Sequence, residues 1–315
     1  NSSRIYYALG DSAYDTKVID YIKQNRRNRA TQGTGPKTIV DPTDIFSEMR
    51  LIKNEEEVRR IRRATEITVD AHIAAMKSTH PGMYEYQVEA LVDSVFRRTE
   101  GGYAGYNSII ASGPNTTILH YTDNDRWIQD GDLVLIDAGC EHRNYNGDVT
   151  RTFPANGKFS PVQREVYQVV LEVQTTLIDL IQPDTRIDIL TDTAIDLLTE
   201  GMIRIRLLEG EKERLIEEKA YRRFYMHGIG HPLGMDVHDI CRIKDGKTFR
   251  RFQPGMITTV EPGIYIAADA RGVPPEYRGI GVRIEDDVLV TTGGYEVLTA
   301  GVPKQIEDIE ALMAG

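Results

Sequence analysis

The sequence predicts an α+β domain in which helices cover one face of a curved antiparallel sheet. Two amphipathic stretches, at 54–80 and 84–99, come before three strand-like runs. Two further helical stretches, at 160–181 and 187–200, come before two more such runs. The order helix, helix, strands therefore occurs twice, which predicts two similar halves although no sequence repeat is visible.

The first fifty residues follow a different pattern from the rest of the chain. Their expected elements are strands at 4–9 and 38–40, a helix at 15–24 and a polar loop at 28–37. A strand–helix–strand piece of this size buries too little surface to be stable alone. We therefore expect residues 1–50 to be the end of an N-terminal α/β domain, with the main domain at 51–315.

Spacing and end signals mark the helices of the main domain. Apolar residues recur at steps of three and four between Val58 and Ala74, which is the stripe of an amphipathic helix. A Pro-Gly pair at 81–82 ends this helix. Ser160 followed by Pro161 predicts the capped start of the third helix, and Gly201 is expected to end the fourth.

Two of the strand-like runs carry carboxylates at their ends. The five runs are at 107–111, 132–137, 148–153, 256–260 and 282–290. Asp137 ends the second and Asp148 opens the third. A hairpin turn at 142–143 would place them directly opposite, with Cβ atoms ~4.5–5.5 Å apart; a turn within 144–147 is the alternative. Two carboxylates that close repel each other unless they share a proton or a cation.

Composition excludes several classes of function. No stretch approaches the ~20 apolar residues of a membrane-spanning helix. The net charge is −10, and the arginines at 59–63 follow three glutamates on a predicted helix. This pattern indicates a solvated helix face rather than a nucleic-acid contact. Cys140 and Cys241 are too few for a disulfide framework and are expected to be reduced, in the cytoplasm.

The segment 227–239 is dense in imidazole, with His227, His231 and His238. His227 and His231 have the spacing of a zinc-protease helix, but glycines and a proline interrupt the segment and no Glu follows His227. We therefore expect a loop. A single histidine here would more often be a packed, hydrogen-bonded residue, whereas three together predict a site.

Two more carboxylates follow in strand-like contexts. Glu261 stands at the end of one run, and Glu285 lies within the next, where Arg283 points to the same face two residues earlier. Seen alone, the latter two would equally well be a surface ion pair. Four carboxylates and one histidine together form an oxygen-rich set, which suits two Mn²⁺, Co²⁺ or Fe²⁺ ions better than a thiolate-rich zinc site.

Taken in order, six motifs resemble the metallopeptidases of the pita-bread fold, and among them aminopeptidase P. The resemblance spans roughly residues 51–299 and is specific because all six motifs occur in sequence. The motifs are at 118–121, 136–139, 147–152, 227–239, 260–263 and 282–286. Residues 1–50 resemble the end of the N-terminal domain in this family, and residues 51–315 its catalytic domain.

The resemblance implies a metal site with five ligands. Asp137 would bind one ion, whereas Asp148 and Glu285 would bridge both ions. His231 and Glu261 would complete the second ion. The expected cofactors are therefore two divalent ions, with Mn²⁺ preferred and Co²⁺ or Fe²⁺ as alternatives.

The resemblance also implies residues that act on the substrate. His120 and His238 resemble histidines near the scissile bond, and either could donate to the developing oxyanion. Glu261 is expected to carry a proton to the leaving nitrogen. His227 and Arg283 match positions that line the site and bind substrate.

The implied function is a two-metal hydrolase that releases the N-terminal residue from peptides with proline second. The segment 201–224 favours aminopeptidase P, whereas Gly230 beside His231 leans towards prolidase, the first alternative. Methionine aminopeptidase and a metal-free peptide-binding pseudoenzyme are more distant alternatives. The expected partners are such peptides, with no nucleic acid and no membrane; the oligomeric state, a homo-oligomer included, stays open.

Overall fold

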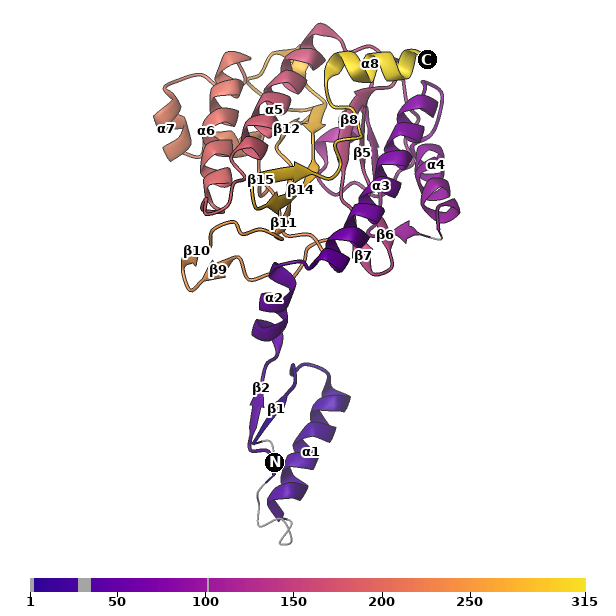
Figure 1. The fold of residues 1–315 in the computed structure, drawn as a ribbon. Helices are drawn as coiled ribbons and strands as arrows, with labels where there is room; N and C mark the ends of the chain where they lie inside the picture. The colour runs from indigo at the N-terminus through magenta and orange to yellow at the C-terminus, as the bar shows by residue number, and fades with distance from the viewer. Residues whose placement is uncertain (1–2, 28–34, 101) are drawn as a thin grey trace. The chain divides into compact units, whose positions relative to one another are not determined.

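The computed structural model describes residues 3–27, 35–100 and 102–315 (Figure 1). It divides the chain into two compact units, which are described separately below. One unit comprises Asn1–Leu51 with Ile240–Arg242, and the other comprises Ile52–Asp239 with Ile243–Gly315. The interpretation of residues 1–50 as the end of a larger domain stays a prediction.

The first unit is a small α/β piece. Strands β1 (Arg4–Tyr6) and β2 (Thr38–Val40) pair in parallel, and helix α1 (Ser12–Arg27) lies between them in the chain. Helix α2 (Thr43–Leu51) follows. Both strands and α1 were expected, although α1 is longer than predicted; most of the loop expected at 28–37 lies outside the described residues.

The second unit begins with two helices, as predicted. Helix α3 (Glu55–Ser78) starts at Asn54, whose side chain accepts backbone N–H groups while Glu57 bonds back to the Asn54 N–H. Helix α4 (Glu85–Arg98) follows the break at 81–82. Ile61 of α3 joins a buried cluster with Ile257 and Leu289 from much later in the chain.

Four helices follow in the second half of the chain. They are α5 (Pro161–Asp179), α6 (Ile189–Arg204), the short α7 (Lys212–Glu217) and α8 (Ile306–Ala314). Ser160 caps α5 as predicted, accepting from the Gln163 N–H at 3.3 Å. Within the described ranges, no helix is both long enough and apolar enough to cross a membrane.

The prediction that Gly201 ends the fourth helix was wrong. Helix α6 continues through Gly201 to Arg204. A Cβ at Gly201 would lie 2.2 Å from a methyl carbon of Val169 on α5. Gly201 therefore allows two helices to approach closely, and it is not a helix stop.

All strand pairs of the second unit are antiparallel, as expected. The first group comprises β3 (Tyr103–Ala104), β4 (Ile109–Ser112), β5 (Leu133–Asp137), β6 (Cys140–His142), β7 (Tyr145–Asn146) and β8 (Thr150–Pro154). The second comprises β9 (Lys244–Asp245), β10 (Thr248–Phe249), β11 (Ile257–Val260), β12 (Gly263–Ile266), β13 (Ile280–Arg283), β14 (Asp286–Thr291) and β15 (Gly294–Val297). The single run expected at 282–290 is therefore divided between β13 and β14.

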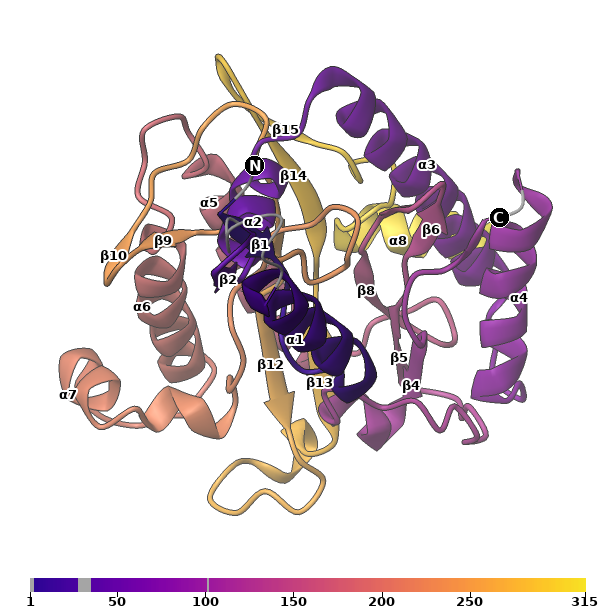
Figure 2. The same cartoon turned by 90° about the horizontal axis from the view of Figure 1, so that it is seen from below.

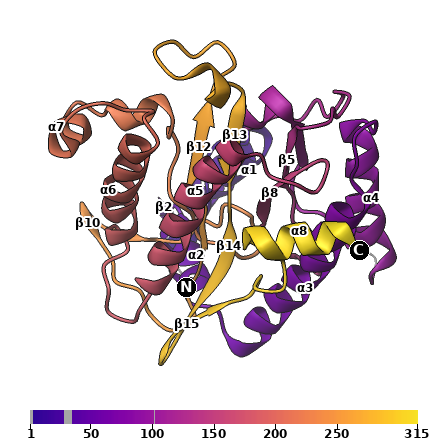
Figure 3. The same ribbon diagram turned by 90° about the horizontal axis from the view of Figure 1, so that it is seen from above.

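Helices α5 and α8 lie on one side of the strands. In Figure 3, α5 and α8 are nearer the viewer than β5, β8, β12 and β13, and in Figure 2, seen from the opposite side, they lie behind these strands. Helix α5 packs on β11, β12 and β13, and α3 packs on β6 and β7. The coarse α+β architecture expected from the element order is present.

Candidate active site

The first carboxylate pair lies where a hairpin ladder is interrupted. The hairpin turns at Arg143 and Asn144, which have φ values of 52° and 67°, the left-handed conformation of a two-residue turn. Neither predicted turn position was correct, and Asp137 pairs with Thr150 rather than with Asp148. Because alternate residues of a strand point to one face, Asp148, two residues before Thr150, still shares the face of Asp137.

The second carboxylate pair lies at a similar interruption. Val260 pairs with Asp286 in one ladder, and Gly263 pairs with Arg283 in the next. Continuing either register across the two intervening positions brings Glu261 opposite Glu285. The ladder between β11–β14 and β12–β13 therefore breaks at the two glutamates.

All nine candidate residues line one cavity of about 630 Å³. Tyr106, Ile109, Leu119 and Val237 contribute other parts of its wall. The candidate residues are Asp137, Asp148, His231, Glu261, Glu285, His120, His227, His238 and Arg283. Positions that lie far apart in the chain thus meet at one site in the second unit.

Tyr106 links the first two carboxylates, and sequence reasoning missed it. Its hydroxyl contacts both carboxylates: Asp137 Oδ1 at 2.7 Å and, in a shorter contact, Asp148 Oδ1. A phenol has one proton, so it can donate to only one of them at a time. Arg283 Nη2 donates to Asp137 Oδ2 at 2.6 Å. Burial raises the pKa of Asp148.

His231 lies among three carboxylates. Its Nε2 is 3.4 Å from Asp148 Oδ2 and 3.8 Å from Glu261 Oε1. Asp148, His231 and Glu285 each offer a ligand atom, and these atoms lie within 4.8 Å of one another. Burial alone would lower the pKa of His231, but Asp148 and Glu261 outweigh it and raise the pKa to about 9. This grouping can hold a metal ion.

The two glutamates are held differently. Glu285 is 2 % exposed and accepts a hydrogen bond from Thr150 Oγ1 at 2.6 Å. Burial raises the pKa of Glu285 well above its usual range. Burial also raises the pKa of Glu261, to about 7, although His231 and Arg283 oppose the shift.

The histidine segment is a loop, as predicted. It runs beside β11: Thr259 N–H donates to the His231 carbonyl at 2.9 Å, and Glu261 N–H donates to the Ile229 carbonyl at 2.9 Å. A Cβ at Gly230 would lie 2.0 Å from the Thr259 carbonyl oxygen. Glycine at 230 thus permits the close approach that brings His231 to the carboxylates.

His227 belongs to a polar chain that ends at Arg283. Arg283 Nη1 donates to the Tyr265 hydroxyl at 3.0 Å, which is 2.9 Å from His227 Nε2. His227 Nδ1 lies 2.7 Å from the Gly228 carbonyl, which can only accept. His227 Nδ1 therefore donates, and Nε2 accepts from Tyr265. Burial lowers the pKa of His227 to about 4, in keeping with this neutral ring.

Comparisons with known proteins decide the family. Residues 59–292 match metallopeptidase family M24. The chain is 46 % identical over 310 residues to Xaa-Pro aminopeptidase of Escherichia coli, covering 98 % of this chain and 70 % of that protein. It is 51 % identical over 275 residues to the Haemophilus influenzae Xaa-Pro aminopeptidase, covering 87 % and 64 %. The chain belongs to metallopeptidase family M24.

Solved structures agree with this M24 assignment. Aminopeptidase PepP of Pseudomonas aeruginosa superposes with a TM-score of 0.95 at 47 % identity, covering 99 % of this chain and 71 % of that one. Zinc-substituted E. coli aminopeptidase P in complex with product gives a TM-score of 0.94 at 46 % identity, with the same coverage. The predicted resemblance to aminopeptidase P is thereby confirmed, together with the α+β fold of this family and its metal-dependent peptidase chemistry.

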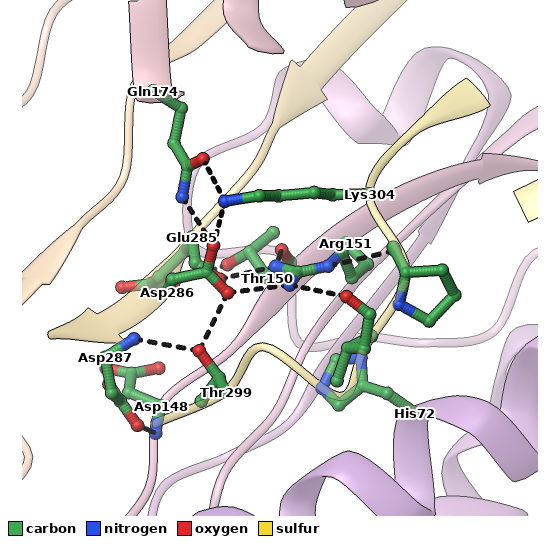
Figure 4. A network of polar contacts seen from close by, with 12 residues as sticks. His72, Asp148, Thr150, Arg151, Gln174, Glu285, Asp286, Asp287, Thr299 and Lys304 are labelled. Carbon is green, nitrogen blue, oxygen red and sulfur yellow. Dashed lines mark hydrogen bonds and ion pairs between the residues drawn. The ribbon is translucent and has the colours of Figure 1, made fainter. Parts of the chain in front are cut away.

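A buried polar network lies behind the site of this M24 chain (Figure 4). Arg151 is fully buried and donates to the backbone carbonyls of Thr150 and Glu285, at 3.0 and 2.6 Å. It also donates to Asp286 at 2.7 Å. Asp287 Oδ2 accepts the Asp148 N–H at 2.9 Å. The network thus holds the backbone of both carboxylate-bearing segments. Arg151 and Asp286 lie within the motifs at 147–152 and 282–286, but the sequence analysis assigned them no role.

Proposed function

We propose that this chain is the catalytic part of an Xaa-Pro aminopeptidase, which cleaves the first peptide bond of substrates with proline second. The main support is that this chain is 46 % and 51 % identical to two relatives named Xaa-Pro aminopeptidase. E. coli aminopeptidase P has also been solved with substrate and with the inhibitor Pro-Leu. The chain spans 70 % and 64 % of the two relatives, so the activity of the whole protein is part of the proposal.

The proposed cofactors are two divalent ions, of which Mn²⁺ is the first choice and Co²⁺ or Fe²⁺ the alternatives. Asp148 and Glu285 would bridge them, Asp137 would bind one, and His231 with Glu261 would bind the other. The donor set supports this because four carboxylates and His231 line one cavity, and of the four carboxylates Arg283 pairs with Asp137. Two dications would neutralise the excess negative charge that burial otherwise opposes.

When bound, the ions would supply Lewis acidity and lower the pKa of a water that serves as nucleophile. The side chains of the protein orient the peptide around this water. His120 and His238 reach the cavity from its exposed wall and donate to the oxyanion that develops on the peptide carbonyl. Glu261, whose burial raises its pKa to about 7, carries a proton to the leaving nitrogen.

Recognition of proline depends on shape, since its nitrogen in a peptide bond has no proton to donate. Ile109, Leu119 and Val237 give the cavity an apolar wall against which an imino ring can pack. His227 and Arg283 bind substrate beside it. The free amino terminus of the peptide binds near the carboxylates.

Several finer features belong to the same proposal. The strands form the curved sheet of a pita-bread fold with two pseudo-symmetric halves, supported by the similar ladder breaks at Asp148 and Glu285. Residues 1–50 are the end of an N-terminal domain. Binding of nucleic acid or membrane is not part of the function, a homo-oligomer is compatible with it, and a cytoplasmic location stays a prediction.

One experiment tests the substrate class directly. The kcat/KM for Ala-Pro-Ala is compared with that for Ala-Pro on the full-length protein, with Mn²⁺ added after chelation. We expect the tripeptide to be preferred. A dipeptide preference of roughly tenfold, about 1.4 kcal/mol in transition-state binding, would instead indicate prolidase. Failure to bind metal or to cleave either peptide would indicate a pseudoenzyme.

A further inference from the structure

Glu85, in the first turn of α4, is a fully buried carboxylate outside the metal site. Five donors surround it. Oε1 accepts from the Ser112 N–H at 2.6 Å, the Ser112 hydroxyl at 2.7 Å and Asn115 Nδ2 at 3.3 Å. Oε2 accepts from the Tyr121 hydroxyl at 2.7 Å and the Arg126 N–H at 2.8 Å. These donors use the acceptor sites that an ionised carboxylate offers.

All the donors to Glu85 come from residues 112–126, which run from the last residue of β4 through most of the connection to β5. One side chain on α4 therefore holds both ends and the middle of this segment. Its position at the start of a helix favours a negative charge because of the helix dipole. A buried carboxylate with several donors is costly to disturb, since any lost acceptor leaves a buried donor unpaired.

Tyr121 connects the buried Glu85 carboxylate to the cavity. Its ring packs in a buried cluster with Ile109 and Leu135, and its hydroxyl is held by Glu85. The residues on either side of it, His120 and Thr122, both line the cavity. In the described part of the chain, no hydrogen bond holds the His120 ring, so its place depends on the backbone next to Tyr121.

We propose that Glu85 is a positioning residue for the peptidase reaction, acting through Tyr121 to hold His120 at the cavity. The inference rests on the proposed function, because His120 is assigned there to the peptide carbonyl. Glu85 touches neither the carboxylate set nor the cavity. Its loss should therefore change the chemical step while metal binding is preserved.

The first test compares Glu85→Gln and Tyr121→Phe with wild type. The amide of Gln would place a donor among the donors that surround position 85, and Phe at position 121 would lack the hydroxyl that Glu85 accepts. We expect kcat for Ala-Pro-Ala to fall roughly ten- to a hundredfold, as expected for a small misplacement of a catalytic group. Mn²⁺ content should stay at the wild-type value. An unchanged kcat in both variants would overturn the proposal.

A matched control separates positioning from general destabilisation. Glu310 of α8 is also a buried carboxylate with several donors, accepting from Lys158 at 3.0 Å, the Phe159 N–H at 3.1 Å and Arg164 at 2.6 Å. It does not line the cavity. Glu310→Gln should lower Tm as Glu85→Gln does but leave kcat unchanged. An equal loss of kcat in both variants would mean that Glu85 has only a structural role.

A double-mutant cycle with His120→Ala tests the route of the effect. If Glu85 acts through His120, Glu85→Gln should lower kcat only slightly on the His120→Ala background, whereas additive losses of kcat would contradict this route.

Hydrogen exchange gives a second measurement that needs no activity: residues 112–126 should exchange faster in Glu85→Gln, and residues 283–291 should not. Unchanged exchange in residues 112–126 would show that Glu85 does not hold this segment. Wild-type protein without peptidase activity would contradict the proposed function, while exchange would still test whether Glu85 holds this segment.

Discussion

The two interrupted hairpins of the site use different side chains and hold them differently. The first carries aspartates, which reach only a short distance from the backbone and share the Tyr106 hydroxyl. The second carries glutamates opposite each other, each one methylene longer. Each hairpin also fixes a proposed metal ligand of the other: Arg283 donates to Asp137, and Thr150 donates to Glu285. Neither half therefore makes a complete site alone.

The second hairpin contains a further contrast between its own glutamates. Glu285 has a short hydrogen bond and is almost fully buried. The Glu261 side chain is 18 % exposed, and its histidine neighbours, His227 and His231, are 3.7 and 3.8 Å away. No hydrogen bond to the Glu261 carboxylate occurs within the described residues. The looser carboxylate suits a group that exchanges a proton during the reaction, and the fixed one suits a structural ligand.

The largest effect should follow a change in the first hairpin. Asp148→Asn preserves the shape but removes a charge from a site proposed to balance two dications. We expect kcat/KM to fall roughly 10³-fold or more, about 4 kcal/mol in transition-state stabilisation, with weaker Mn²⁺ binding. Kinetics and metal titration would measure this, with the exposed Asp269→Asn as control. Near-full activity at limiting metal would refute the two-metal proposal.

The contrast between the glutamates predicts different failures. Glu261→Gln should lower kcat by roughly 10²- to 10³-fold, because it removes a proton carrier, while retaining more metal than Glu285→Gln. Metal content after dialysis, measured beside kcat for both variants, tests the ranking. The comparison would be wrong if Glu285→Gln retained the metal better.

The contact between the hairpins should matter to a smaller extent. Thr150→Val removes the hydroxyl that donates to Glu285, and outer contacts of this kind change metal affinity by roughly 10- to 100-fold. Thr152→Val is the matched control, since its hydroxyl bonds only the backbone of Arg283. Equal Mn²⁺ affinities of the two variants would show that the Thr150 contact is dispensable.

The smallest effect is expected for Tyr106→Phe. Asp137 keeps Arg283 as a donor, and Asp148 keeps its ion pair with His231. We therefore expect less than roughly a tenfold loss of kcat/KM, within the net value of one hydrogen bond. If Tyr106→Phe lowered kcat/KM more than Thr150→Val does, the Tyr106 hydroxyl would be the more important of the two.

Local chain chemistry determined most of the helices, and the family resemblance indicated the candidate site residues. The apolar spacing from Val58 to Ala74 predicted α3, and Ser160 before Pro161 predicted the start of α5, because both signals act between near neighbours. The six motifs contain the nine candidate residues, all of which line the cavity. Their proposed roles still await the experiments above.

Tertiary structure alone decided how these residues are held. The hairpin register, the break between β13 and β14 and the close packing at Gly201 were missed or predicted incorrectly. The supporting contacts were not visible either: Thr150 and Glu285 are 135 positions apart, and Tyr106 and Asp148 are 42 apart. Local propensity carries no information on which distant strands meet, since that depends on packing the whole chain around one core.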